Sequence, residues 1–214
     1  MKTDVFNLMR LMVGEIATNC YILHNLEQHK LIVIDPGGDA QDIEGAIAGF
    51  LSEVEAILIT HGHYDHLMAV AALKEKHPEA VFIAPEAEKP VLAMYSDFIG
   101  DTPLNVTGPP DRYVKDQEVL ELIGTKLKVI ATPGHTAGSV CYYDEELQIL
   151  FSGDTLFRQT CGRVDLPTGN ARSMRNSLHL LRDIIPDEVK VLPGHMQLSL
   201  MGDEKKNNPY ITHI

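Results

Sequence analysis

Four apolar runs of this chain, each with the length and composition of a buried strand, end in side chains that can bind metal ions. The runs and the residues that follow them are 56–59 with His61, His63, Asp65 and His66, 127–131 with His135, 149–151 with Asp154, and 189–192 with His195. In open α/β sheets, sites form beyond the carboxyl ends of strands, where loops bring distant side chains together. A glycine lies just before a ligand in each of these loops and lets the backbone turn sharply. The sequence therefore predicts a fold in which four strand ends meet around one metal site.

The segment 60–66 is the strongest part of this pattern. Three imidazoles and a carboxylate fall within residues 61–66. An isolated histidine more often packs, caps a helix or faces water than binds a metal. The histidines outside the pattern are interpreted in that way, namely His24, His29, His77, His179 and His213. A cluster of this density at a strand end is better explained as a site for a divalent cation.

The order of strand-like and helix-like patterns indicates the fold class. Strands are expected over 5–13, 20–23, 31–34, 56–59, 81–84, 127–131, 140–143, 149–151 and 189–192, and helices over 40–51, 65–76, 86–94 and 171–184. Runs of strands with helices between them predict a layered α/β domain rather than a strict βαβ repeat. The stretch 96–112, rich in Pro, Gly, Asp and Asn, is expected to be a long loop, either functional or a tolerated insertion. A length of 214 residues suits one domain.

The charge balance narrows the class of partner. A formal net charge of -12 argues against nucleic acid, because binding to phosphates needs clustered Lys and Arg. No secretory signal and no apolar run of membrane-spanning length is evident, so no membrane partner is expected. The three widely spaced cysteines, Cys20, Cys141 and Cys161, predict a reducing compartment without disulfides. Together these features predict a cytoplasmic protein.

Seven candidate ligands exceed what one cation can use, so two cations are expected. His61, His63 and His135 would offer three neutral nitrogens to the first. Asp65, His66 and His195 would hold the second. Asp154 would bridge two cations about 3.5–4 Å apart. Asp65 is also expected to stand at the start of the helix 65–76, where its carboxylate would offset the positive end of the helix dipole.

Asp35 follows another apolar run, in Ile34-Asp35-Pro36-Gly37-Gly38. Two interpretations stand side by side. Asp35 either forms a turn with the following proline and glycine, or accepts a hydrogen bond from the N–H of a metal-binding histidine.

Taken together, the motifs resemble those of the metallo-β-lactamase superfamily. His61-Gly62-His63-Tyr64-Asp65-His66 matches its HxHxDH signature, and His135, Asp154 and His195 match the later ligand positions in order. The resemblance runs from about Gly14 to Asn208-Pro209-Tyr210. It implies a four-layer αββα sandwich, formed here as a single domain over 1–214, with a dinuclear metal site at one edge of its paired sheets.

Within the superfamily the chain is most similar to glyoxalase II, the hydroxyacylglutathione hydrolases. The resemblance lies in Thr18-Asn19-Cys20-Tyr21, in Pro133-Gly134-His135-Thr136-Ala137-Gly138-Ser139, in Gly153-Asp154-Thr155-Leu156-Phe157 and in Cys161-Gly162-Arg163. Two features depart from that family. The helical C-terminal extension with further glutathione contacts is missing, and Val164-Asp165-Leu166-Pro167-Thr168-Gly169 is closer to short bacterial relatives and to persulfide dioxygenases.

The resemblance implies hydrolysis of hydroxyacylglutathione-like thioesters, small molecules, by a hydroxide that bridges two divalent metal ions. Zinc is the first expectation for these ions, with iron or manganese as alternatives. Coordination to metal lowers the pKa of water from about 15.7 towards 7. Asp65 and Asp154 are the candidate catalytic carboxylates, and Asp65 would orient the nucleophile. Arg163 would bind a substrate carboxylate, or else form a structural ion pair with Asp165.

Other reactions on the same scaffold remain open. A persulfide dioxygenase would hold one iron at His61, His135 and Asp154, and the segment 162–165 favours that reading. A lactonase would use the same hydroxide to open a cyclic ester. β-Lactam hydrolysis is disfavoured because Asp154 stands where many of those enzymes use Cys. A protein that binds metal without catalysing a reaction is the alternative outside the enzymes. The sequence does not indicate an oligomeric state.

Overall fold

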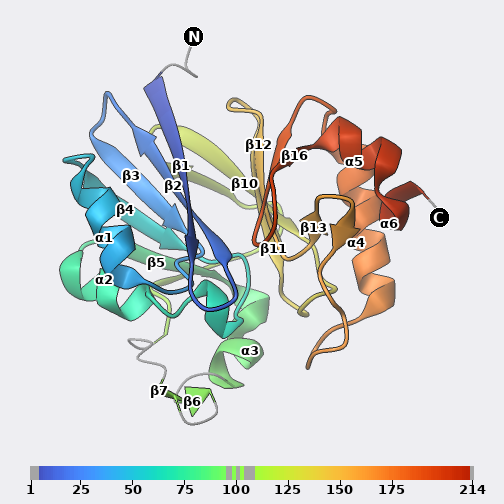
Figure 1. Ribbon diagram of the computed structural model, residues 1–214, viewed down its shortest axis with the longest axis horizontal. Helices are drawn as coiled ribbons and strands as arrows, with labels where there is room; N and C mark the ends of the chain where they lie inside the picture. Colours follow the sequence, from blue (N-terminus) through green and yellow to red (C-terminus); the bar gives the residue numbers. More distant parts are fainter. Residues whose placement is uncertain (1–4, 95–97, 100–101, 104–108, 213–214) are drawn as a thin grey trace.

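The computed structural model describes residues 5–94, 98–99, 102–103 and 109–212, and its strands form two six-stranded sheets packed face to face (Figure 1). The first sheet has the order β1-β2-β3-β4-β5-β8. Its strands are β1 (Phe6–Val13), β2 (Thr18–Asn25), β3 (Lys30–Ile34), β4 (Glu53–Leu58), β5 (Val81–Pro85) and β8 (Arg112–Val114). The pairs β1–β2 and β2–β3 are antiparallel, and the strands from β3 to β8 are parallel.

The second sheet has the order β16-β15-β12-β11-β10-β9. Its strands are β9 (Val119–Leu122), β10 (Thr125–Ala131), β11 (Val140–Asp144), β12 (Ile149–Gly153), β15 (Lys190–Pro193) and β16 (Ser199–Leu200). Only β12 and β15 are parallel, since α4 (Ala171–Ile184) lies between them in the chain. Two short antiparallel pairs complete the strands, β13 (Leu156–Phe157) with β14 (Thr160–Cys161), and β6 (Phe98–Ile99) with β7 (Thr102–Pro103).

Three apolar cores separate four layers. Alternate residues of a strand point to opposite faces, so Tyr21 and Leu23 of β2 join the core between the sheets, while Cys20 and Ile22 join the core under α1 and α2. The helices on that side are α1 (Ala40–Ala48) and α2 (Val70–Lys76). The third core lies between the second sheet and α4, α5 (Met201–Asn207) and α6 (Pro209–Thr212). The predicted αββα sandwich is thereby confirmed.

The largest correction concerns the predicted helix 65–76. Residues Tyr64–His66 form a separate 3-10 helix, η2, and α2 begins only at Val70. The interruption has a tertiary cause, because the backbone N–H of Ala69 donates to the carbonyl oxygen of Pro36 at 2.9 Å. The prediction that Asp65 opens an α-helix and offsets its dipole was therefore wrong.

Other element bounds also differ from the sequence prediction. The helix expected over 86–94 is divided into a 3-10 helix η3 (Glu86–Glu88) and α3 (Lys89–Met94). The helix expected over 40–51 ends at Ala48, whereas α4 has the predicted bounds. Within the expected loop 96–112, the pair β6–β7 is formed and β8 begins at Arg112, while 96–97, 100–101 and 104–108 lie outside the described residues. None of the helices in the described part of the chain is long and apolar enough to cross a membrane.

Candidate metal centre

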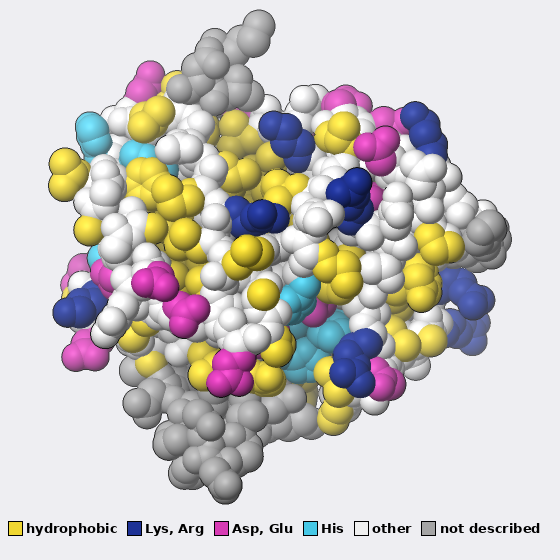
Figure 2. Space-filling model, in the orientation of Figure 1, with side chains coloured by type: hydrophobic (Ala, Val, Ile, Leu, Met, Phe, Trp, Pro, Cys, Tyr) yellow, Lys and Arg dark blue, Asp and Glu magenta, His cyan; other side chains and the backbone are white. Residues whose placement is uncertain are grey.

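The candidate ligands come from the carboxyl ends of strands in both sheets. The 61–66 segment follows β4 of the first sheet, and His135, Asp154 and His195 follow β10, β12 and β15 of the second. The seven side chains lie together at one edge of the sandwich, where histidine side chains reach the surface in the lower centre of Figure 2. They are buried or nearly so, and the His195 side chain, at 18%, is the most exposed among those in ion-pair contacts. The predicted convergence of four strand ends is thus the arrangement that the fold produces.

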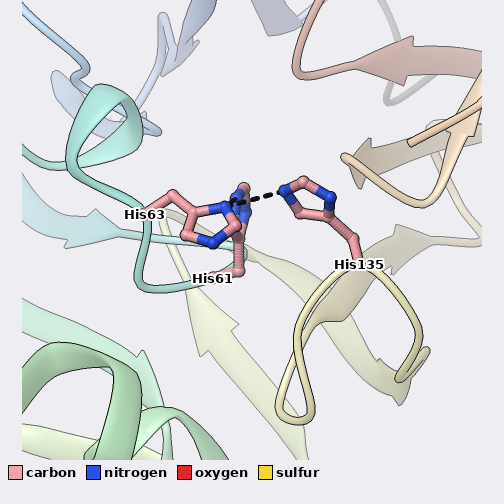
Figure 3. A group of neighbouring side chains, drawn as sticks. All are labelled: His61, His63 and His135. Atoms are coloured by element: carbon pink, nitrogen blue, oxygen red, sulfur yellow. Dashed lines mark hydrogen bonds between the residues drawn. The ribbon is translucent and has the colours of Figure 1, made fainter. Parts of the chain in front are cut away.

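The first group of ligands consists of three imidazoles (Figure 3). The Nδ1 atom of His63 lies 3.1 Å from Nε2 of His61 and 2.8 Å from Nε2 of His135. Donor atoms 2.0–2.1 Å from a tetrahedral zinc ion lie roughly 3.3 Å from one another. Three nitrogen atoms at such separations can therefore share one cation.

The second group contains Asp65, His66 and His195. One oxygen of Asp65, Oδ2, lies 3.3 Å from Nε2 of His66 and 3.2 Å from Nε2 of His195. Thr18, at the start of β2, donates its hydroxyl to the same oxygen at 3.2 Å. One oxygen of Asp65 is therefore shared by the Thr18 hydroxyl and the two histidines.

Asp154 lies between the two groups. Its Oδ2 atom is 3.5 Å from Nε2 of His135 in the first group and 3.5 Å from Nε2 of His195 in the second. Its Oδ1 atom is 3.4 Å from Nε2 of His66. A carboxylate in this position can face two cations at once.

Two buried atoms of this centre show that a cation fits it. Nε2 of His66 and Oδ1 of Asp154 are buried and lie 3.4 Å from each other, yet neither forms a hydrogen bond. Leaving such groups unpaired in the interior is costly, and buried polar atoms are nearly always satisfied. His66 and Asp154 form, with His61, a third group of side chains that could hold a cation, beside the two groups described above. Mixed imidazole and carboxylate donors suit zinc, iron or manganese.

The electrostatic environment keeps His61, His63 and Asp65 in their metal-binding forms. Burial lowers the pKa of His61 well below its ordinary value and, aided by neighbouring His135, lowers the pKa of His63 to about 4. These imidazoles are therefore neutral at physiological pH, as metal ligands must be. Burial alone would raise the pKa of Asp65, but His66 and His195 outweigh it and hold that pKa well below its usual range. At His66 and His195, burial alone would lower the pKa, but the neighbouring carboxylates outweigh it and raise the pKa, so these two imidazoles must lose a proton to bind a cation.

Hydrogen bonds behind the ligands select the nitrogen that faces the centre. Thr60 donates its hydroxyl to Oδ2 of Asp35 at 2.8 Å, so its oxygen can accept from Nδ1 of His61, 3.1 Å away, which leaves Nε2 unprotonated. Likewise, Nδ1 of His135 lies 2.8 Å from the backbone carbonyl oxygen of Arg163. That bond turns Nε2 of His135 towards the centre.

Asp35 contacts both the strand end and a candidate ligand. Its two oxygens accept from the backbone N–H of Thr60 at 2.7 Å and from the Thr60 hydroxyl, and Oδ2 is 3.1 Å from Nδ1 of His66. The backbone of Asp35 has φ of 52°, a left-handed conformation that is uncommon outside glycine. The side chain of Asp35 thus lies against a ligand histidine, and its role towards that ligand stays a prediction.

The side chain of Arg163 forms the ion pair that was one of its two predicted roles. Its Nε and Nη2 atoms donate to the two oxygens of Asp165, each at 2.7 Å, and both side chains are mostly exposed. Arg163 also lines a cavity of about 500 Å³ with Arg175, Tyr210 and apolar residues of α4. Its role in binding a substrate carboxylate remains a prediction.

Glu88 is a residue of this region that the sequence analysis missed. Its carboxylate is fully buried in η3 and accepts hydrogen bonds from both loops that carry the first group of histidines. Burial raises its pKa, although hydrogen bonds from Thr136, Gly62 and Gly138 oppose that effect. The glycines at 62 and 138 were a signal of close packing, but they did not indicate what packs there.

Comparison with known proteins agrees with this centre and this fold. Residues 13–195 match the family described as the Metallo-beta-lactamase superfamily. The chain is 27% identical over 208 residues to the hydroxyacylglutathione hydrolase GloC of Haemophilus influenzae, with 96% of this chain and 98% of that protein covered. It is 31% identical over 212 residues to the probable metallo-hydrolase YqgX of Bacillus subtilis, covering 94% and 96%.

Three solved structures are similar over nearly the whole chain. BLEG-1, a B3 metallo-beta-lactamase, is 31% identical with a TM-score of 0.89, covering 96% of this chain and all of that one. TTHA1623 in a di-iron-bound form is 30% identical with a TM-score of 0.82, covering 94% and 99%. ETHE1 from Myxococcus xanthus is 25% identical with a TM-score of 0.78, covering 97% and 89%. With its sandwich fold and its cluster of histidines and aspartates, the chain belongs to the metallo-beta-lactamase superfamily.

Proposed function

We propose that this protein hydrolyses thioesters of the hydroxyacylglutathione type, with two divalent cations held by the seven residues of the centre. The observation that carries the proposal is the position of Asp154, whose carboxylate lies 3.4–3.5 Å from histidines of both ligand groups. The likeness to GloC over nearly the full length of both chains supports the thioester substrate. The likeness to a di-iron-bound structure supports a centre for two metal ions and leaves iron as an alternative to zinc.

Two such cations supply an activated water at neutral pH and a Lewis acid for the carbonyl oxygen of the substrate. Asp65 is the carboxylate best placed to accept a hydrogen bond from the attacking water, because Thr18 fixes one of its oxygens and its side chain is 12% exposed. The His195 side chain is also partly exposed, so the substrate would approach from the side of Asp65 and His195. A thiolate is a good leaving group, so the reaction needs no strong general acid.

The proposal is tested by metal analysis and substrate turnover on the same preparation. We expect two cations per chain and hydrolysis of S-lactoylglutathione, measured by release of the free thiol. A simple S-acyl thioester without the glutathione portion serves as the matched substrate. Equal turnover of both would support the thioesterase but remove glutathione from the substrate class. A chain that holds metal yet cleaves neither would contradict the proposal.

A persulfide dioxygenase is the second candidate. The likeness to ETHE1 from Myxococcus xanthus favours it, as does the segment 162–165. In that case a single iron would occupy His61, His135 and Asp154, and the protein would consume oxygen in the presence of glutathione persulfide. Oxygen uptake by the iron-loaded protein, compared with thiol release by the zinc-loaded protein, separates the two functions.

Two other hydrolytic activities, on β-lactams and on lactones, must be distinguished from thioester hydrolysis by experiment. The likeness to BLEG-1 brings β-lactam hydrolysis back into consideration, although Asp154 replaces the Cys of many such enzymes. A lactonase would act on a cyclic ester at the same centre. A chromogenic cephalosporin and a homoserine lactone, assayed beside the thioester, provide the comparison, and we expect the thioester to give the highest kcat/KM.

A further inference from the structure

Glu88 is a buried carboxylate with no place in the proposed chemistry. It lies in η3, directly after β5, and its side chain is fully buried. Its partners are one hydroxyl and two backbone amides, and no lysine or arginine of the described residues forms an ion pair with it. Burying an ionisable group in this way is costly unless its hydrogen bonds serve a purpose.

The two oxygens of Glu88 bind two different loops. Oε2 accepts from the backbone N–H of Gly62 at 2.6 Å, between the candidate ligands His61 and His63. Oε1 accepts from the Thr136 hydroxyl and from the backbone N–H of Gly138, each at 2.7 Å, just after His135. One side chain therefore ties together the two loops whose three histidines form the first group.

The residues facing Glu88 on both loops leave room for it. A Cβ atom added at Gly62 would lie 2.9 Å from Oε2 of Glu88. A Cβ atom added at Gly138 would lie 2.5 Å from Oε1 and 2.4 Å from the carbonyl carbon of Ala87. Any side chain at position 138 would push that loop away from η3, so the close approach depends on glycine there.

The three histidines of the first group need a fixed separation between the loops. His63 and His135 come from different sheets, yet their nitrogens lie 2.8 Å apart. A backbone hydrogen bond from Val140 to Thr60 joins the two segments at the base of the loops, and Glu88 bonds to both loops from a third element, beside the histidines themselves. Ligand atoms are held in productive geometry by outer contacts of this kind, and losing such a contact typically weakens metal affinity by 10–100-fold.

We propose that Glu88 is a positioning residue that holds the 61–63 and 135–138 loops at the spacing required for His61, His63 and His135 to share one cation. The inference rests on the metal centre proposed above. Loss of the Glu88 carboxylate should weaken the binding of the cation by the first group. The binding of the other cation by Asp65, His66 and His195 should not change.

The test is a titration of metal-free protein with Co²⁺, followed by the visible spectrum, together with metal content after dialysis. For Glu88→Gln we expect affinity for one of two cations to fall by roughly 10–100-fold, with the second unchanged. The spectrum should resemble that of His63→Ala, which removes a ligand of the first group, and not that of His195→Ala. Glu88→Gln keeps the size of the side chain but presents an amide N–H where a carboxylate oxygen accepted.

Asp144→Asn is the matched control. Asp144 is another fully buried carboxylate, and it likewise accepts from a threonine hydroxyl and a backbone amide, those of Thr125 and Leu147. It lies at the far end of β11, whose first residue, Val140, contacts the strand end at Thr60. We expect Asp144→Asn to lower the thermal stability of the protein without changing either Co²⁺ affinity.

A second variant guards against misfolding of Glu88→Gln. Thr136→Val removes the hydroxyl that donates to Oε1, together with its contact to the Ser139 hydroxyl, and nearly preserves the shape of the side chain. It should shift the same Co²⁺ affinity in the same direction by a smaller factor. Wild-type affinities in both Glu88→Gln and Thr136→Val would overturn the inference, as would an equal loss in Asp144→Asn. Wild-type protein that binds fewer than two cations would instead count against the proposed dinuclear function, while the ratio of variant to wild-type affinity still reports on Glu88.

Discussion

Nδ1 of His135 lies 2.8 Å from the backbone carbonyl oxygen of Arg163, across 28 residues of sequence. Through this contact the backbone of Arg163, rather than its side chain, orients His135. The Arg163 guanidinium is engaged with Asp165 at the surface, while the backbone orients a candidate metal ligand. The main chain and the side chain of one residue can therefore be tested separately.

Arg163→Ala should leave the metal content unchanged, because the carbonyl oxygen that accepts from His135 is retained. If the guanidinium binds a substrate carboxylate, KM for the thioester should rise with little change in kcat, since ground state and transition state lose the same interaction. Steady-state kinetics on metal-loaded protein provides the measurement. An unchanged KM would assign the side chain to its ion pair with Asp165 alone.

Substituting single ligands should show which cation each ligand holds. His135→Ala is expected to lose the cation of the first group, whereas Asp154→Ala should weaken both cations because Asp154 faces both groups. Thioester turnover should fall by roughly two to three orders of magnitude in either variant, the size of effect seen when a main electrostatic stabiliser is removed. Metal content by elemental analysis is measured beside the assay. Full metal with full activity in either variant would refute the assignment.

Asp35→Asn should weaken metal binding while largely preserving the fold. Asparagine tolerates the left-handed backbone found at Asp35, where alanine would be strained. It lacks the second carboxylate oxygen that lies near Nδ1 of His66 and accepts from Thr60. We expect a 10–100-fold loss of metal affinity for Asp35→Asn and an additional loss of thermal stability for Asp35→Ala. Equal behaviour of the two variants in both measurements would contradict this account.

Removing metal should destabilise the protein. A ligand that binds only the folded chain, at 1,000 times its Kd, contributes about 4 kcal/mol. For a chain of this size, 1 kcal/mol shifts Tm by about 2–4 °C, so each cation should raise Tm by roughly 8–16 °C. Differential scanning calorimetry with chelator and after adding back zinc measures the shift. An unaltered Tm would show that the cations bind weakly or not at all.

The cysteines should react slowly with alkylating reagents in the folded protein. Burial raises the pKa of Cys161 to about 11 and that of Cys141 to about 12, and it raises the pKa of Cys20 further. The thiolate is the reactive form, and at pH 8 a thiol of pKa 11 is ionised in about one molecule per thousand. Reactivity should therefore grow as pH rises, first at Cys161, the most accessible of the three. Rapid labelling of Cys161 at pH 7, followed by mass spectrometry, would contradict this.

The candidate ligands stand out in the sequence for a physical reason. Buried strands leave apolar runs, and ligands at their ends interrupt those runs in a recognisable way, as at Ile59-Thr60-His61. The break between η2 and α2 could not be predicted in the same way, because its cause is a hydrogen bond from Ala69 to the distant Pro36.

Glu88 illustrates the same difficulty. Two of its three bonds go to backbone amides of loops far along the chain, and a backbone amide carries no residue-specific signal. Short elements such as β13, β14 and β16 are only two residues long, too short for any periodicity to mark them. Hydrogen bonds between distant segments of the chain cannot be predicted from sequence periodicity.

Each ligand group takes two side chains from the 61–66 segment of the first sheet and one from a loop of the second. A bound cation would consequently cross-link the two halves of the chain. Any change that loosens the packing of one sheet on the other must then lower cation affinity, and cation binding must tighten that packing by the same free energy. A substitution in the apolar core between the sheets, far from any ligand, could in this way alter the metal content of the protein.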